Sequence, residues 1–283
     1  MNKLKFFLPY MMLLIFTASC KKGDDSVEAL KSEDFANVSY STHTRNTMDV
    51  YLPEKRDRNT PVILLVHGGS WYEGDKSAFT DLAKYWRDKG YAAATMNYRY
   101  THTAENNINP AQVNDIGKAI DFIASKSTDW QVSGDKFALQ GASAGAHLSL
   151  LYIYNYDSGN KVKTVISMAG PTDLTKIQGA GVAQAQVAEW LIGSTFQANP
   201  TAYALASPIT YVTAKSKPTL IFHGKLDVVV PYQQSLDLKN KLDQFNISSK
   251  LVTYEDTGHE VINLKNTASF LADCESWLKL YLK

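Results

Sequence analysis

Short, almost uninterrupted runs of apolar residues recur along this chain and constrain its fold more than any other feature. The first run covers residues 61–66, and similar runs follow at 91–96, 136–139, 162–168, 219–222 and 250–254. A strand that is buried on both faces has this composition, and such strands occur in parallel sheets. Segments with apolar residues three and four positions apart separate the runs. This alternation predicts an α/β fold in which helices cover both faces of a mostly parallel sheet.

Two regions depart from this alternation. Near the start, residues 35–42 and 47–52 have strand-like composition and flank a short polar segment, which predicts a hairpin. Later, residues 171–218 mix Gly, Ala, Gln and Pro and contain one helical pattern, around 182–191. We interpret residues 171–218 as a small cap-like insertion over the carboxyl edge of the sheet, where the loops of α/β proteins carry function.

The charge balance and the cysteine count exclude several classes of protein. With 29 basic and 28 acidic residues, the chain lacks the basic surplus that neutralises phosphates, so we expect no nucleic-acid partner. Cys20 and Cys274 are too few for a disulfide framework or a zinc site built on thiolates. No histidine pair has metal-ligand spacing with an acid nearby. The sequence therefore predicts no metal and no other cofactor.

The N-terminus has the three parts of an export signal. Two lysines and an apolar run over residues 6–16 lead through small residues to Cys20. The run is shorter than the roughly 20 apolar residues of a transmembrane helix. Small residues before a cysteine resemble a lipobox. We therefore expect an exported bacterial lipoprotein, held in the outer membrane on its periplasmic or cell-surface face by lipid on Cys20; an ordinary cleaved signal or a membrane anchor is the alternative.

This interpretation divides the chain into three parts. Residues 1–19 form the signal peptide, and residues 20–33 carry the lipid and form a polar, flexible tether. Residues 34–283 form the folded domain. If Cys20 carries lipid, Cys274 has no partner and is expected to be a packed thiol in the last helix.

The most informative motif is Gly-x-Ser-x-Gly at residues 141–145, between an apolar run and a helical pattern. A nucleophile on a sharp strand-to-helix turn needs small neighbours, which Gly141, Ala144 and Gly145 provide. The helix that follows directs its N-terminus at developing negative charge. The motif therefore predicts that Ser143 is a nucleophile.

A serine hydroxyl needs a base to remove its proton, and His259 is the best placed of six histidines. It lies on a loop directly after the last apolar run, beside Gly258, where it can reach the sheet edge. The other candidates lie at strand ends, in the helix after the nucleophile or in early loops: His43, His67, His102, His147 and His223.

The base needs a carboxylate that orients it and stabilises its charged form. Asp227 lies on the loop after the apolar run at 219–222 and is favoured for this role. Asp173, which follows the preceding run, is an alternative. Glu255 and Asp256 are close to His259 along the chain, which is unfavourable for facing its outer nitrogen.

A third loop, His-Gly-Gly-Ser-Trp at residues 67–71, follows a buried run. Glycine permits a close approach of backbone N–H groups to an oxyanion. We expect N–H groups of this loop, together with the N–H of Ala144, to be these donors. Aromatic rings stack on sugars, so Trp71 and Tyr98 are candidates for the substrate pocket.

These motifs together resemble the carboxylesterase branch of the α/β hydrolases. The resemblance rests on residues 67–71, 73–76, 97–100, 141–148 and 223–227 and covers about 38–283. It is greatest to small bacterial esterases related to feruloyl esterases, acetyl-sugar esterases and kynurenine formamidase. It implies an α/β-hydrolase fold with a mostly parallel eight-stranded sheet, and a Ser143–Asp227–His259 triad in the chain order of that fold. It also implies oxyanion donors at Ala144 and at Gly69 or Ser70.

The resulting hypothesis is a serine carboxylesterase that cleaves acyl or aromatic esters of carbohydrates through an acyl-enzyme. Its partners would be a small-molecule or glycan ester and, through Cys20, a membrane. One alternative is an amidase or peptidase of the same fold. Another is a carbohydrate-binding lipoprotein without catalysis.

Overall fold

The computed structural model of the chain describes residues 30–283, together with Met1. The predicted signal peptide, the lipid site at Cys20 and most of the predicted tether lie outside the described residues. Over residues 30–283, no helix combines the length and the apolar character that crossing a membrane requires.

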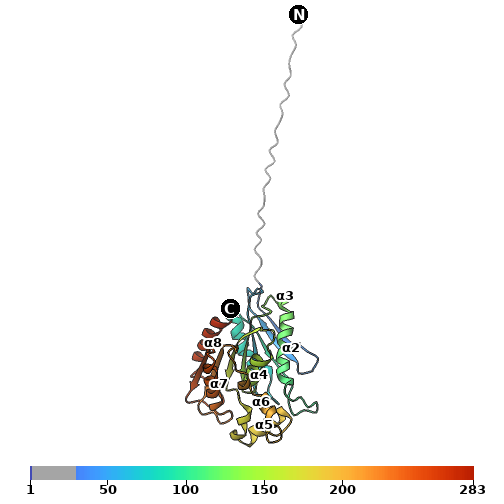
Figure 1. Cartoon of the computed structure of the whole chain (residues 1–283). Coiled ribbons are helices and arrows are strands. Elements are labelled where there is room, and N and C mark those ends of the chain that lie inside the picture. Colours follow the sequence, from blue (N-terminus) through green and yellow to red (C-terminus); the bar gives the residue numbers. More distant parts are fainter. Residues whose placement is uncertain (2–29) are drawn as a thin grey trace.

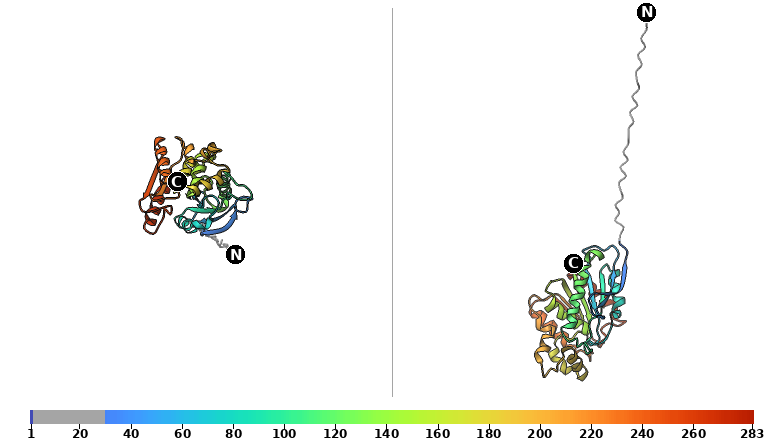
Figure 2. Two further views of the ribbon diagram at one scale, coloured as in Figure 1. Left: turned by 90° about the horizontal axis from the view of Figure 1, so that it is seen from below. Right: turned by 90° about the vertical axis from the view of Figure 1, so that its right-hand side faces the viewer.

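A single eight-stranded sheet forms the centre of the structure, in the order β1-β2-β4-β3-β5-β6-β7-β8. The strands are β1 (Glu33–Ser39), β2 (Thr47–Leu52), β3 (Val62–Val66), β4 (Ala92–Met96), β5 (Phe137–Ala142), β6 (Val162–Met168), β7 (Thr219–Gly224) and β8 (Ser249–Tyr254). β2 pairs antiparallel with both β1 and β4, and all other neighbours are parallel. Figure 2 (left) shows the first strands in blue and the last helices in red on opposite sides of the molecule.

Helices cover both faces of the sheet. α1 (Thr80–Asp88) and α8 (Thr267–Tyr281) pack on one face, and α2 (Ala111–Ser125), α4 (Ala144–Leu151) and α7 (Gln233–Gln244) pack on the other. The shorter elements are η1 (Lys76–Phe79), α3 (Ser127–Trp130) and the π-helical turn η2 (Tyr152–Tyr156). Cys274 of α8 is fully buried, and this burial raises the pKa of its thiol.

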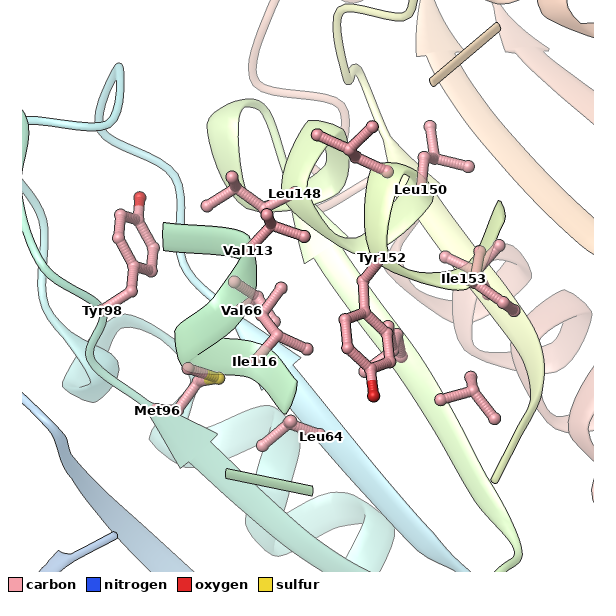
Figure 3. Packing of buried hydrophobic residues seen from close by; sticks show 14 of the residues in the cluster. Leu64, Val66, Met96, Tyr98, Val113, Ile116, Leu148, Leu150, Tyr152 and Ile153 are labelled. Carbon is pink, nitrogen blue, oxygen red and sulfur yellow. The ribbon is translucent and has the colours of Figure 1, made fainter. Parts of the chain in front are cut away.

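The alternation of side chains along the central strands creates the two cores. In β3, Leu64 and Val66 belong to the core that includes α2 and α4, whereas Ile63 and Leu65 belong to the core on the opposite face. Figure 3 shows Leu64 and Val66 close to helices α2 and α4. Full burial of one such side chain contributes about 1.5–3 kcal/mol, which explains why these runs carry no polar alternation.

The segment 171–218 lies between β6 and β7. It contains η3 (Leu174–Ala180), α5 (Val182–Ile192), α6 (Pro200–Leu205) and η4 (Pro208–Tyr211), of which sequence patterns predicted only α5. Figure 1 shows α5 and α6 together at the bottom of the molecule. Since the segment starts where β6 ends, it lies over the carboxyl ends of the parallel strands. We call residues 171–218 the cap segment.

Candidate active site

Ser143 occupies a strained turn between β5 and α4. Its backbone has φ 51° and ψ −120°, a conformation that non-glycine residues rarely adopt. A Cβ on Gly145 would lie 2.1 Å from the carbonyl oxygen of Val66, and one on Gly141 would lie 2.4 Å from that of Gly145. A Cβ at Gly145 would therefore overlap the end of β3, and a Cβ at Gly141 would overlap the start of α4. Only glycine fits at these two positions, which explains the spacing of the motif.

The three residues predicted to form a triad lie within hydrogen-bond distance of one another. Ser143 Oγ is 2.9 Å from His259 Nε2, and His259 Nδ1 is 2.8 Å from Asp227 Oδ2. They follow strands β5, β7 and β8, and the parallel direction of these strands brings the three loops to one edge of the sheet. His259 is partly exposed, whereas the Asp227 side chain is fully buried.

Asp227 is held as an ionised carboxylate by donors on both oxygens. Burial by itself raises the pKa of Asp227, but hydrogen bonds from His223, His259 and the Val230 N–H outweigh burial and hold the pKa well below its ordinary value. Oδ1 accepts from the N–H groups of Val229 and Val230 at 2.8 and 2.9 Å. Four hydrogen-bond donors therefore fix the orientation of this buried carboxylate and offset the free-energy cost of keeping it ionised.

Sequence reasoning missed the role of His223 at this carboxylate. Its Nε2 lies 3.1 Å from Asp227 Oδ2 and 2.9 Å from the carbonyl oxygen of Val230, so Nε2 carries the proton that is donated to these acceptors. On the other side of the ring, Nδ1 is 2.6 Å from Ser235 Oγ. The available signal was the four-residue spacing between His223 and Asp227 at the end of a strand.

The alternative acids do not contact His259. Asp173 caps η3 by accepting from the Thr175 N–H, and it lies 3.5 Å from Lys176 Nζ. Glu255 forms an exposed ion pair with Lys225. Asp256 is exposed as well.

The loop after β3 forms a turn of three successive residues with positive φ: Gly69 (102°), Ser70 (47°) and Trp71 (64°). The carbonyl oxygen of Gly69 accepts from the N–H groups of Tyr72 and Glu73 and closes the turn. Within residues 30–283, the N–H groups of Gly69, Ser70 and Ala144 donate to no acceptor. Ala144 begins α4, where first-turn N–H groups have no partner inside the helix. In the described part of the chain, these three N–H groups therefore have no acceptor of their own.

A buried histidine anchors this loop. Trp71 Nε1 donates to His147 Nδ1 at 3.1 Å, and His147 Nε2 donates to the carbonyl oxygen of Ala206 at 2.8 Å. Burial lowers the pKa of His147 to about 4, so the ring stays neutral and can accept from Trp71. His147 thus connects the turn with positive φ to α4 and to the cap segment.

The prediction that Tyr98 lines the substrate pocket is wrong. Tyr98 is fully buried, and its hydroxyl donates to the carbonyl oxygens of His67 and Gly68 at 3.1 and 3.2 Å. Its ring stacks on His67 at 4.4 Å between centroids. Because Tyr98 follows β4, the neighbour of β3 in the sheet, it lies beneath the loop and supports it.

Two cavities of unequal size meet at Ser143. The larger has a volume of about 380 Å³ and includes His259, Glu73, Glu260, Phe79 and Ile262 in its lining. The smaller has a volume of about 30 Å³ and includes Trp71, Ala144, Ile177 and Val187. Ser70 and Val229 border both. Sequence reasoning used residues 73–76 as a motif but did not assign Glu73 or Glu260 to a pocket, because charged residues on loops carry no periodic signal.

Comparison with known protein families shows to which family the chain belongs. The model of the BD-FAE family matches residues 48–242, which is more than half of the chain. The chain belongs to the BD-FAE family. The matched region of this BD-FAE chain contains Ser143 and Asp227, whereas His259 lies beyond its end.

Curated relatives of this BD-FAE chain include several hydrolases. The "Probable carboxylic ester hydrolase LipM" of Mycobacterium tuberculosis is 25% identical over 264 residues, covering 88% of this chain and 57% of that protein. The "Probable isoprenylcysteine alpha-carbonyl methylesterase ICMEL1" of Arabidopsis thaliana is 23% identical, covering 81% and 52%. Dipeptidyl-peptidase 5 of Aspergillus fumigatus is 23% identical, covering 93% and 38%. The chain thus spans little more than half the length of the first two relatives.

Solved structures similar to this BD-FAE chain show its fold. A bifunctional GH43-CE protein of Bacteroides eggerthii has a TM-score of 0.76 and 24% identity, covering 86% of this chain and 38% of that one. A truncated carbohydrate esterase from gut microbiota has a TM-score of 0.72 and 23% identity, covering 86% and 96%. The chain has the α/β-hydrolase fold, as the resemblance of its motifs implied.

Proposed function

We propose that this chain is a serine carboxylesterase that hydrolyses acyl or aromatic esters of carbohydrates through an acyl-enzyme on Ser143. The observation that carries the proposal is the hydrogen-bonded row Ser143–His259–Asp227, with spacings of 2.9 and 2.8 Å. Nucleophile, base and orienting carboxylate are the three groups that acyl transfer from an ester requires. Two of the relatives are named as a probable carboxylic ester hydrolase and a probable methylesterase, which supports the same reaction class.

In the proposed reaction, Ser143 Oγ attacks the ester carbonyl while His259 Nε2 takes the hydroxyl proton. The negative charge that develops on the carbonyl oxygen is stabilised by the N–H of Ala144 and by that of Gly69 or Ser70. The ionised Asp227 stabilises the imidazolium. The imidazolium then protonates the leaving alcohol, and His259 activates a water that releases the acid from Ser143.

The larger cavity favours a neutral, hydroxyl-rich alcohol. Glu73 and Glu260 are both exposed and line this cavity. Within the described part of the chain, no Lys or Arg side chain lines it. Carboxylate oxygens accept hydrogen bonds from sugar hydroxyls and repel anionic substrates. The structural likeness to a protein named as a carbohydrate esterase agrees with this substrate class.

The proposal is tested by comparing the purified chain with Ser143→Ala on p-nitrophenyl acetate and on an acetylated xylo-oligosaccharide. We expect turnover by the native chain and a loss of at least about 10³-fold in the variant. A fluorophosphonate probe should label the native chain at Ser143. Equal turnover by both proteins, or no labelling of Ser143, would contradict the proposal and favour a binding protein without catalysis.

A peptidase of the same fold is the second candidate, and the likeness to dipeptidyl-peptidase 5 favours it. The same nucleophile and base serve ester and amide cleavage. An ester and an anilide with the same acyl group distinguish the two functions. Higher kcat/KM on the aminoacyl nitroanilide than on the matching aminoacyl ester would establish the peptidase.

We also propose that the chain is an exported lipoprotein anchored to the outer membrane through lipid on Cys20, on its periplasmic or cell-surface face. Two lysines, the apolar run and the small residues before Cys20 support this proposal. Incorporation of radioactive palmitate into the native chain, and none into Cys20→Ala, is the expected result. Palmitate in neither protein would exclude the lipid anchor.

A further inference from the structure

We infer that the small cavity beside Ser143 is the acyl site and that this chain prefers esters of acetyl and propionyl groups. The inference rests on the proposed esterase function and narrows its substrate class. It starts from the two cavities that share Ser143, with volumes of about 30 and 380 Å³. An ester bound at Ser143 must place its acyl group on one side and its alcohol on the other.

The position of His259 decides which side takes which group. His259 lines the large cavity and does not line the small one. The leaving alcohol oxygen has to receive its proton from His259, so the alcohol lies in the large cavity. The acyl group bonded to the carbonyl carbon therefore extends into the small cavity.

The volume of the small cavity limits the acyl group. On one and the same measure, the small cavity has a volume of about 30 Å³ and the large one about 380 Å³, so the small cavity accepts a much shorter group than the large one. The methyl of an acetyl group and the ethyl of a propionyl group fit this space. A long alkyl chain or an aromatic acyl group exceeds it.

The walls of the small cavity resist expansion. Trp71 is buried and fixed by its hydrogen bond to His147. Ile177 of η3 is also buried, and Val187 of α5 is half-buried. Two of these three walls come from the cap segment, so the cap segment sets the length of the acyl group.

The test is kcat/KM of the purified chain across p-nitrophenyl acetate, propionate, butyrate, hexanoate and octanoate. We expect a decrease of at least about tenfold between propionate and hexanoate, because one methylene in a tight apolar pocket changes kcat/KM by roughly 10- to 200-fold. Val187→Ala should raise the hexanoate-to-acetate ratio at least about fivefold. Ile262→Ala, which enlarges only the large cavity, should leave this ratio unchanged.

Several outcomes would overturn the inference. These are a flat profile, a preference for octanoate, turnover of methyl ferulate comparable with that of methyl acetate, and equal effects of Val187→Ala on all chain lengths. Ile177→Val replaces Val187→Ala if that variant fails to fold, as judged by its thermal melting. Full activity with a long-chain preference overturns this inference alone. Absence of hydrolysis of every ester overturns the proposed function and the inference together.

Discussion

The buried His223 places its Nε2 3.1 Å from Oδ2 of Asp227. The same oxygen accepts from His259 Nδ1 at 2.8 Å, so two imidazole rings bind one carboxylate oxygen. His259 faces the nucleophile, whereas His223 lies in the core and touches no cavity that contains Ser143. His223 is therefore a positioning residue that acts through Asp227.

Replacement of His223 by Leu should lower activity without removing the nucleophile. A hydrogen bond to a charged group contributes about 1.5–3 kcal/mol, so kcat/KM should fall by roughly 10- to 100-fold. His223→Gln retains a donor near the position of Nε2 and should recover part of the loss. Equal activity of the Leu and Gln variants, at equal melting temperature, would contradict a positioning role.

His147 should be required for the shape of the loop that carries Gly69 and Ser70. His147→Leu removes the acceptor for Trp71 Nε1, and we expect kcat to fall by about tenfold or more. In His147→Asn, the side-chain oxygen replaces Nδ1 as the acceptor, so this variant should retain more kcat than the Leu variant. Steady-state kinetics with p-nitrophenyl acetate compare the two. If both variants reduce kcat equally, the hydrogen bond from Trp71 does not contribute to kcat.

Two buried histidines predict how stability depends on pH. Burial lowers the pKa of both His67 and His147 to about 4, below the ordinary value of 6.5. Between these values the unfolded chain binds more protons than the folded chain, so stability decreases as pH falls from about 6.5 to about 4. Urea unfolding at several pH values measures the slope. His147→Asn should show a smaller decrease than the native chain, and an identical slope would contradict the assignment.

Glu73 and Glu260 should determine the preference of the alcohol site for uncharged substrates. Glu73→Gln with Glu260→Gln should raise kcat/KM on acetyl esters of uronic acids, because repulsion is removed, and lower it on neutral acetyl sugars. Both side chains are exposed, so we expect effects of only a few-fold that shrink in high salt. The matched pair of substrates provides the control. If the ratio of kcat/KM between the uronic-acid ester and the neutral ester does not change at low salt, these carboxylates do not face the alcohol.

Gly145→Ala should damage both stability and activity. The added Cβ would lie 2.1 Å from the Val66 carbonyl oxygen and 2.4 Å from that of His67, so α4 must move away from β3. Overpacking of this kind costs about 1–3 kcal/mol, and the shift separates Ser143 from the loop after β3. Gly159→Ala is the matched control, since its Cβ would touch only Lys161, at 3.6 Å. A native melting temperature for Gly145→Ala would contradict the close approach.

The strands and Ser143 were predictable because their signals are local. An apolar run indicates a strand that is buried on both faces, and the run at 162–168 coincides with β6. The segment of strand-like composition at 47–52 coincides with β2. Other boundaries moved by a few residues. β1 ends at Ser39 instead of residue 42, because Tyr40 already pairs with Asn46 across the turn, and β5 continues to Ala142. The short helices of the cap segment left no periodic pattern long enough to detect.

By itself, the sequence determined the class of fold and the residues that meet at the edge of the sheet. Parallel strands end at one edge, so their order along the chain already predicts which loops meet there. Only the tertiary structure decided the roles of His223, His147 and Tyr98, which looked like catalytic or substrate-binding candidates. It decided the sizes of the two cavities as well. These properties depend on contacts between residues that are distant along the chain, which no local pattern encodes.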